Sequence, residues 1–559
     1  MAGEWGSKKK AVIAGVASIL LVAAIIAVAI GTTKSDNSGG SGGIPDVEST
    51  TKAVDAICAP TQYKETCQNS LVGANTTDPK KLIETAIDVT VKSIGGVLEK
   101  SSLLKEVAND PMTKGAFEVC KEVLEKAVDD LRRSVDKVGE FDAAKAKEYI
   151  GDLRTWLSAV VTNQETCVDA FENTTGDTGE KMKNLLKTAR ELSSNGLAMV
   201  TDISEAVGSL PLEHADGSRK LLSEEEEGFV NRRLLEATTL SLKPTIEVAK
   251  DGSGKFKSIN EALATLPKKN NESFIVIHIK AGVYNENIDI PKGLNKLVFV
   301  GDGPKSTIIT GDKSMAGGVQ TYYTATLAVN GQDFLAKDIG VENTAGPNGN
   351  QSLAVRVSGD RAIFYNVVMD GYQDTLCADT HRQFYRNCTI SGTVDFVFGN
   401  GLALFQDCTF VVRKPGPKQA CMVTAQGRSD ANSNSAIIIQ NGHFKADPAL
   451  LAAQPPVTSF LGRPWKEMAR TIIMQSDIEG FINPTGWAPW VGNVGLDTCY
   501  YVEHNNRGPG AKTTGRAKWK GIRHLTPEQV QSWTGRAVYG GDGWIAKSGV
   551  PYAPTMMQV

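Results

Sequence analysis

Three motifs decide the fold: QSLAV at residues 351–355, GYQDTL at 371–376 and DFVFG at 395–399. Gln351 lies 22 residues before Gln373, which itself lies 22 residues before Asp395. Asp374 precedes Asp395 by 21 residues. A repeat of this length is close to one coil of a β-helix, in which residues far apart in sequence stack on one face. The spacing therefore predicts that these four polar side chains lie together.

Two carboxylates and two amides that converge on one face have the groups needed for acyl transfer. A carboxylate can act as nucleophile, a second carboxyl as general acid, and amides as oxyanion donors. The carboxylate pair alone would also suit a glycosidase. The two glutamines favour an esterase, because acyl transfer forms an oxyanion and glycosidic cleavage does not. A glycosidase and a protein that only binds a polymer or a partner enzyme are the alternatives.

The sequence beyond Lys243 consists of short β-branched runs broken by Gly, Asn and Asp. Examples are FIVIHI at 274–279, KLVFV at 296–300 and AIIIQ at 436–440. Many short strands with little helix between them predict an all-β fold, either a sandwich or a β-helix. The coil-sized spacing favours a right-handed parallel β-helix over residues 244–545, in which each coil buries its apolar face against the next.

Residues 47–210 have a helical pattern instead. Apolar residues recur at intervals of three and four in 116–131 and again in 152–171. We predict an all-α four-helix bundle stapled by disulfides. The chain has nine cysteines, and the disulfides that we expect are Cys58–Cys67, Cys120–Cys167 and, one coil apart around the DFVFG motif, Cys388–Cys408. Cys377, Cys421 and Cys499 have no partner assigned by the sequence.

The N-terminal region predicts entry into the secretory pathway. Residues 1–10 form a cytoplasmic tail that ends in three lysines, 11–31 are an uncharged transmembrane signal anchor, and 32–46 are a Ser/Gly-rich linker. A cleavable signal peptide with its cleavage site at 27–29, AVA, is the alternative. Four N-glycosylation sequons agree with this route: Asn75, Asn173, Asn271 and Asn387.

Residues 211–240 predict an exposed linker between the two domains. The acidic run at 224–227 lies between SRKLL at 218–222 and RRLL at 232–235. Such a segment cannot bury enough apolar surface to fold alone. Paired basic residues in an exposed linker are candidate sites for a processing protease, either at Arg219-Lys220 or at Arg232-Arg233.

The two halves of the chain differ in charge. Residues 1–233 carry 28 basic and 36 acidic side chains, and residues 234–559 carry 32 and 27. A mildly basic C-terminal half suits an anionic polymer, although solvated surfaces without a partner explain the balance equally well. The six histidines have no metal-ligand spacing and no Gly-rich loop opens a βαβ unit, so we predict no metal, no cofactor and no nucleic-acid partner.

Five segments in order resemble the plant pectin methylesterases, which remove methyl esters from cell-wall homogalacturonan. They are GVYNE at 282–286, the three motifs above, and LGRPW at 461–465. The N-terminal domain resembles the pectin methylesterase and invertase inhibitors, through Cys58-x8-Cys67 and WLSAVVTNQETC at 156–167. One departure is Cys377, which stands where an aromatic residue is common in the family.

The resemblance implies a role for each catalytic candidate. Asp395 would be the nucleophile that forms an acyl-enzyme, and Asp374 would protonate methanol and then activate water. Gln351 and Gln373 would form the oxyanion hole, and Arg463 would orient Asp395.

The resemblance also implies six substrate contacts, two of which are made by catalytic candidates: Arg463, Gln351, Trp465, Thr321, Tyr372 and Phe396.

The resemblance also implies a precursor with several partners. A subtilase-type protease would remove the inhibitor-like pro-domain, which would inhibit the enzyme or assist its folding. Extracellular pectinesterase inhibitors would bind the mature enzyme in the cell wall. Before processing, the N-terminal segment would attach the chain to a membrane.

Overall fold

The computed structural model describes residues 47–106, 110–139, 146–209 and 243–558. The chain divides into two compact units, one mainly helical and one mainly β. The predicted tail, anchor and first linker (1–46) and the predicted processing linker (211–240) lie outside the described residues. Within the described ranges, no helix is both long and apolar enough to cross a membrane.

The helical unit is built on four long helices, preceded by two short ones. Their bounds are α2 Val47–Cys58, α3 Lys64–Leu71, α4 Pro79–Glu106, α5 Pro111–Gly139, α6 Ala146–Asp169 and α7 Thr178–Ser209. Apolar residues on one face of each long helix are buried, as the spacing of three and four predicts. The prediction of an all-α bundle is confirmed.

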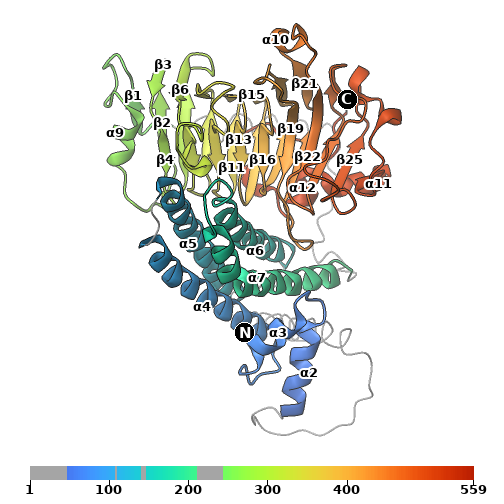
Figure 1. Ribbon diagram of the computed structural model, residues 1–559. Helices are drawn as coiled ribbons and strands as arrows, with labels where there is room; N and C mark the ends of the chain where they lie inside the picture. Colours follow the sequence, from blue (N-terminus) through green and yellow to red (C-terminus); the bar gives the residue numbers. More distant parts are fainter. Residues whose placement is uncertain (1–46, 107–109, 140–145, 210–242, 559) are drawn as a thin grey trace, which may run out of the picture. The chain divides into compact units, whose positions relative to one another are not determined.

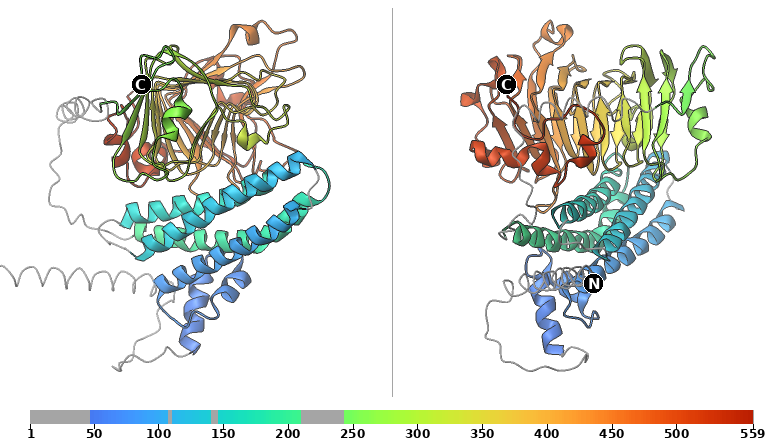
Figure 2. Two further views of the ribbon diagram at one scale, coloured as in Figure 1. Left: turned by 90° about the vertical axis from the view of Figure 1, so that its left-hand side faces the viewer. Right: turned by 180° about the vertical axis from the view of Figure 1, so that it is seen from behind.

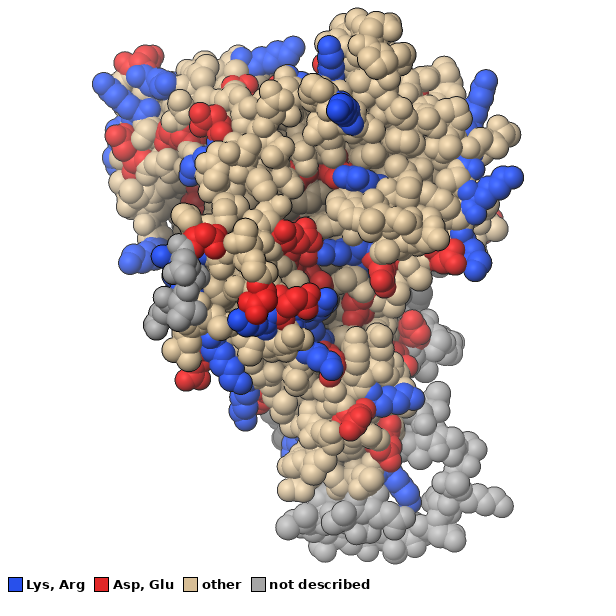
Figure 3. Space-filling model, viewed as in Figure 1, with Lys and Arg blue, Asp and Glu red and all other residues tan. Residues whose placement is uncertain are grey.

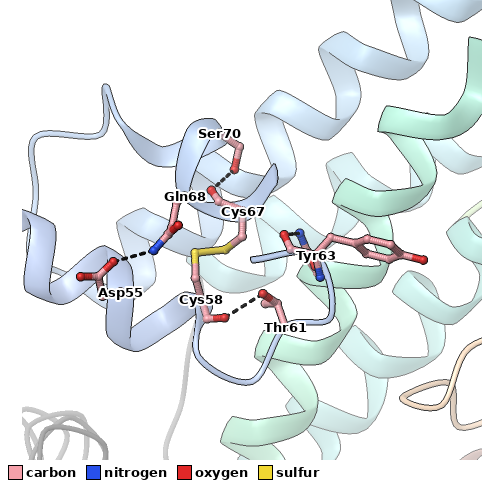
Figure 4. The surroundings of a disulfide bond; sticks show 8 residues. Asp55, Cys58, Thr61, Tyr63, Cys67, Gln68 and Ser70 are labelled. Atoms are coloured by element: carbon pink, nitrogen blue, oxygen red, sulfur yellow. Dashed lines mark hydrogen bonds between the residues drawn. A yellow bond between two sulfur atoms is a disulfide. The ribbon is translucent and has the colours of Figure 1, made fainter. Parts of the chain in front are cut away.

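Disulfides join neighbouring helices of this bundle, as predicted. Cys58–Cys67 links α2 to α3, and Cys120–Cys167 links α5 to α6. Around the first disulfide, the Gln68 amide donates to Asp55 and the Thr61 hydroxyl donates to the Cys58 carbonyl, which closes the short connection between the two helices (Figure 4). A cross-link over such a short loop mainly restrains the unfolded chain.

The β unit consists of three parallel sheets, and most coils contribute one strand to each of them (Figure 1). The view on the left of Figure 2 looks nearly along the stack of coils. Every strand pair is parallel, and from β2 to β25 sequential strands fall in different sheets, so the chain winds as a parallel β-helix. This confirms the predicted fold class and excludes a sandwich.

The eleven-stranded sheet contains, in spatial order, β1 Ile246–Val248, β2 Ile275–Ile279, β5 Leu297–Gly301, β8 Leu335–Lys337, β11 Ala362–Tyr365, β14 Arg382–Arg386, β17 Leu402–Gln406, β20 Ala436–Gln440, β23 Arg470–Met474, β25 Tyr500–His504 and β26 Ile522–Arg523. The seven-stranded sheet contains β22 Ser459–Pro464, β19 Cys421–Gln426, β16 Val397–Gly399, β13 Leu376–Ala378, β10 Val355–Val357, β7 Leu327–Val329 and β4 Ile288–Ile290. The eight-stranded sheet contains β24 Asp477–Ile478, β21 His443–Ala446, β18 Thr409–Val412, β15 Thr389–Gly392, β12 Val368–Asp370, β9 Gly340–Asn343, β6 Thr307–Gly311 and β3 Gly282–Asn285.

Short helices cap and flank the coils: α9 Ile259–Ala264, η3 Thr321–Tyr323, α10 Pro448–Leu451, η4 Pro509–Ala511, η5 Thr513–Gly515, α11 Pro527–Val530, η6 Gln531–Trp533, α12 Gly535–Val538 and α13 Gly543–Ala546. The carboxylate of Glu286, from the GVYNE motif, accepts hydrogen bonds from the first backbone N–H groups of α9, each at 2.9 Å. This motif therefore has a structural role here.

Stacked side chains fill the interior of the β-helix. The rings of Phe364, Tyr385 and Phe405 lie in successive coils, with centroids 5.1 and 4.4 Å apart and planes within 9° of parallel. In-register parallel pairing brings equivalent positions of successive coils together, so one inward-facing aromatic per coil produces a continuous core.

The predicted Cys388–Cys408 disulfide is wrong, because both residues are free, buried thiols. They precede Thr389 and Thr409, which are paired across β15 and β18, so the two cysteines occupy equivalent positions on adjacent coils. Equivalent positions on parallel in-register strands are related by a shift of about 4.8 Å, so their β-carbons also lie about that far apart, beyond the mean of about 3.8 Å for a disulfide. The coil-length spacing that suggested the pair thus holds the thiols side by side without joining them.

Candidate active site

The two candidate aspartates occupy equivalent turns of adjacent coils. Asp374 and Asp395 each lie two residues before a strand of the seven-stranded sheet, and Leu376 pairs with Val397 between these strands. Both aspartates have left-handed backbones, with φ of 64° and 51°. Only a few non-glycine residues adopt this region, and aspartate is among those that tolerate it. The in-register coils therefore stack the two carboxylates, as the spacing of 21 residues predicts.

Both carboxylates are almost fully buried, with exposures of 8% for Asp374 and 4% for Asp395. Asp395 has an ion partner: Arg463 Nε lies 2.9 Å from Oδ1 and Nη2 lies 2.6 Å from Oδ2. This two-point fork fixes the plane of the carboxylate as well as its charge. The Arg463 guanidinium carbon lies 4.1 Å from the centre of the Trp490 ring, which supports the guanidinium from another side.

The electrostatic environment separates the two carboxyl groups. Burial raises the pKa of Asp374 well above its ordinary value, the charge of Asp395 raises it further, and Arg463 opposes the shift. Burial also raises the pKa of Asp395, but the hydrogen bonds and charge of Arg463 counteract that rise. Asp374 therefore keeps its proton to a higher pH, and Asp395 ionises first.

The two glutamines carry free amides beside the carboxyl groups. Gln373 directly precedes Asp374, and Gln351 directly precedes Ser352, whose backbone N–H donates to the Gln373 carbonyl at 3.2 Å. Both side chains are half-buried. Within the described part of the chain, neither side-chain amide has a hydrogen-bond partner, so both can donate to a ligand.

A row of outward-facing side chains crosses the seven-stranded sheet next to the aspartates. Strand register brings together one residue from each of six neighbouring strands: Ala328, Arg356, Cys377, Phe398, Ala425 and Arg463. We call these six residues the site row. Trp465 packs edge-on against Phe398, with centroids 5.9 Å apart. The site row and its tryptophans form an apolar surface that Arg356 interrupts and Arg463 ends.

Not every predicted substrate contact belongs to this surface. Phe396 is wrong, because its ring is fully buried in the interior of the β-helix. Phe398, two positions further along, faces outward instead. Strand β16 begins only at Val397, whose side chain faces the interior, so Phe398 faces outward while Phe396 belongs to the preceding turn. The sequence gave no signal for this difference, and none for Trp490, which lies in a loop outside every motif.

Thr321 and Tyr372 are half-buried and remain predicted substrate contacts. Thr321 begins η3, which reaches the site row, since the Tyr322 ring centre lies 3.6 Å from the guanidinium carbon of Arg356. Tyr372 directly precedes Gln373 in the turn of Asp374.

No group of His, Cys, Asp or Glu residues suited to hold a metal occurs in the ranges that the structure describes. Charged side chains of both signs are dispersed over the face shown in Figure 3.

This fold and this constellation define a class: a β-helical hydrolase of carboxylic esters. Comparison with known sequences identifies the family. Residues 245–542 match the Pectinesterase family and residues 52–199 match the plant invertase/pectin methylesterase inhibitor family. The chain belongs to the pectinesterase family and has an inhibitor-like helical domain.

Relatives and a solved structure agree with this assignment. Pectinesterase/pectinesterase inhibitor 28 of Arabidopsis thaliana is 46% identical over 552 residues, which cover 98% of this chain and 75% of that protein. A pectinesterase of Petunia integrifolia is 50% identical over 382 residues, 68% of this chain and 100% of that protein. The structure of pectin methylesterase from carrot matches with a TM-score of 0.56 and 44% identity, over 56% of this chain and 99% of that one.

Proposed function

We propose that the chain removes methyl esters from homogalacturonan through an aspartyl acyl-enzyme. The observation that carries the proposal is the pair of stacked carboxyl groups, of which only Asp395 is held by an arginine fork. A carboxylate that ionises first and a neighbour that stays protonated supply a nucleophile and a general acid side by side.

In the first half-reaction, an ionised Asp395 oxygen attacks the ester carbonyl. The amides of Gln351 and Gln373 donate to the resulting oxyanion. Asp374 transfers its proton to the departing methoxide oxygen as the carbon–oxygen bond breaks, and methanol leaves. An anhydride between Asp395 and the galacturonate carboxyl remains.

In the second half-reaction, Asp374 is a carboxylate and accepts a proton from water. The hydroxide attacks the galacturonate carbonyl of the anhydride, and the bond to Asp395 breaks. Asp395 leaves as a carboxylate, held again by Arg463, and the product is galacturonate with a free carboxyl group. Asp374 has its proton back, so the cycle consumes one water and releases one methanol.

Methanol release from highly methylated pectin tests this proposal. The expected result is release by residues 234–559 and none above background by the folded Asp395→Asn variant. The full-length chain is assayed beside the fragment. Reducing ends produced without methanol would identify a glycosidase and contradict the proposal.

We also propose that the chain is a secreted precursor. Anchoring by residues 11–31, cleavage at Arg219-Lys220 or Arg232-Arg233 by a subtilase-type protease, and release of the β-helix to the cell wall are supported by sequence patterns. Inhibition by the pro-domain is supported by the match of residues 52–199 to the inhibitor family. Equal methanol release per mole by the uncleaved chain and by residues 234–559 would contradict inhibition.

A further inference from the structure

Arg413, which belongs to none of the five motifs, contacts the turn that carries Gln373 and Asp374. Its Nη1 donates to Asp370 Oδ1 at 2.9 Å and to the Gly371 carbonyl at 3.0 Å. Its Nη2 donates to the Tyr372 hydroxyl at 2.9 Å. The guanidinium carbon also lies 4.0 Å from the centre of the Tyr372 ring. One side chain thus contacts three consecutive residues immediately before Gln373.

The β-helix determines why Arg413 can reach this turn. Arg413 directly follows β18, and its backbone N–H donates to the Gly392 carbonyl of the neighbouring coil at 2.8 Å. Asp370 ends β12, one coil further along the eight-stranded sheet. The Arg413 side chain therefore reaches from the coil of β18, past the coil of β15, to the turn that follows β12.

Backbone hydrogen bonds to the next coil also hold the turn, from Gly371 to Ser391 and from Asp374 to Val394, but they do not fix the side chains of Tyr372 and Gln373. Tyr372 and Gln373 are both half-buried, and the Gln373 amide has no hydrogen-bond partner in the described part of the chain. Asp374 itself has a left-handed backbone, φ 64°, which ordinary residues adopt only when their surroundings impose it. The direction of the Gln373 amide and the Asp374 carboxyl thus depends on how firmly residues 370–372 are held.

We propose that Arg413 is a positioning residue of the esterase, which holds the turn so that Gln373 and Asp374 face the ester. The inference rests on the proposed function. It assigns Arg413 no contact with the reacting atoms. A misplacement of about 1 Å at such a turn costs about 100-fold in rate.

A purely structural role for Arg413 predicts a different result. The ion pair with Asp370 is partly exposed, with side-chain exposures of 24% and 38%. Pairs of this kind contribute about 0–1 kcal/mol to the free energy of unfolding. Loss of the three Arg413 hydrogen bonds should therefore change stability little and change turnover strongly, whereas a structural role would leave turnover unchanged.

The test compares Arg413→Lys with Arg386→Lys as a matched control. Arg386 pairs with Asp407 at similar exposures of 18% and 27%, on a different sheet from the site row. Methanol release by each folded variant gives kcat and KM separately. We expect Arg413→Lys to lower kcat about tenfold or more with KM within about twofold, at the same Tm as Arg386→Lys.

A double-mutant cycle with Tyr372→Phe examines the contact itself. If Arg413 acts through Tyr372, the loss of kcat caused by Arg413→Lys should be smaller in the Tyr372→Phe background.

Equal kcat for Arg413→Lys and Arg386→Lys would overturn the proposal, and so would a rise in KM alone. If the unsubstituted chain releases no methanol, the proposed function fails instead, so the two failures are distinguishable.

Discussion

The outer faces of the seven-stranded and eleven-stranded sheets are built by the same coils but differ in what lies on them. The C-terminal segment covers the face of the eleven-stranded sheet, whereas the face of the seven-stranded sheet holds the candidate active site. On the eleven-stranded sheet, one register row is apolar over nine neighbouring strands, from β2 to β25: Val276, Val298, Leu335, Ile363, Phe384, Leu404, Ile438, Ile472 and Val502. We call these nine residues the covered row. Val530, Tyr539, Ile545 and Val550 of the C-terminal segment pack on it and exclude water.

On the seven-stranded sheet, the site row mixes alanine, cysteine and phenylalanine with two arginines. The apolar residues of this row are nearly buried, but Asp374, Asp395 and Arg463 flank or belong to it. Asp374 and Asp395 are already almost fully buried, whereas the Arg463 side chain is still 21% exposed. Removing this ion from its remaining water under a further protein segment would cost several kcal/mol. The parallel ladder thus supplies equivalent rows on both sheets, while their composition decides which row is covered and which becomes an active site.

The largest expected effect comes from removing the nucleophile next to the site row. Asp395→Asn keeps the size of the side chain but removes the charge that attacks the ester. We expect kcat to fall about 10⁴- to 10⁶-fold, as for the loss of other enzymatic nucleophiles. Methanol release and circular dichroism of the same preparation check this result. A folded variant that keeps a tenth of the wild-type rate would refute the acyl-enzyme.

Asp374→Asn should have the next largest effect, because it removes the general acid. We expect methanol release to fall about 10²- to 10⁴-fold. The same variant should be more stable than the wild type at neutral pH. Asp374 has a raised pKa in the folded state, so the folded state holds its proton more tightly than the unfolded state does.

The sign of this stability effect follows from proton linkage. The contribution of the Asp374 carboxyl to the free energy of unfolding is greatest below its pKa in the unfolded chain, about 3.9. This contribution is lost as the pH rises through the higher pKa of the folded state. The Tm of Asp374→Asn minus that of the wild type should therefore be near zero at acidic pH and become positive towards neutral pH. A difference that does not change with pH would contradict the raised pKa.

Arg463→Lys should have a smaller effect that separates orientation from charge. Lysine retains the positive charge but cannot form the fork with both Asp395 oxygens. We expect kcat to fall about 10- to 100-fold. Because the Arg463 hydrogen bonds lower the pKa of Asp395, their loss should move the acidic limb of the kcat profile to higher pH. A profile that falls in rate without any shift would argue against this role.

The sequence predicted the site better where chemistry coincided with coil spacing. Asp374 and Asp395 are separated by one coil of 21 residues, so the parallel register stacks them. The spacings of 22 residues from Gln351 to Gln373 and from Gln373 to Asp395 differ from a coil by one residue, which still places the glutamines in the same row of turns. Trp490 and Arg413 reach the site from loops and neighbouring coils, and no spacing in the sequence indicates this. Cys388 and Cys408 had the correct spacing as well, but the structure holds them as two free thiols on adjacent coils. Coil spacing therefore predicts proximity and does not predict the bond.

The smallest expected effects on kcat come from replacing one tyrosine by phenylalanine beside the site row and one over the covered row. Tyr372→Phe removes the hydroxyl that accepts a hydrogen bond from Arg413 beside the site row. Tyr539→Phe removes the hydroxyl that donates to the Gln383 carbonyl at 2.6 Å over the covered row. Loss of a buried hydrogen bond costs about 1–3 kcal/mol. Tyr539→Phe should therefore lower the free energy of unfolding and leave kcat unchanged.

Tyr372→Phe should show the opposite pattern. Its side chain is half-buried, so water can replace the lost partner and stability should change by less than about 0.5 kcal/mol. The turn before Gln373 and Asp374 should become less firmly held, and kcat should fall several-fold. Denaturant unfolding and methanol release on the two variants measure both quantities. If both variants altered stability alone, the division between a covered row and a site row would not extend to the residues around each row.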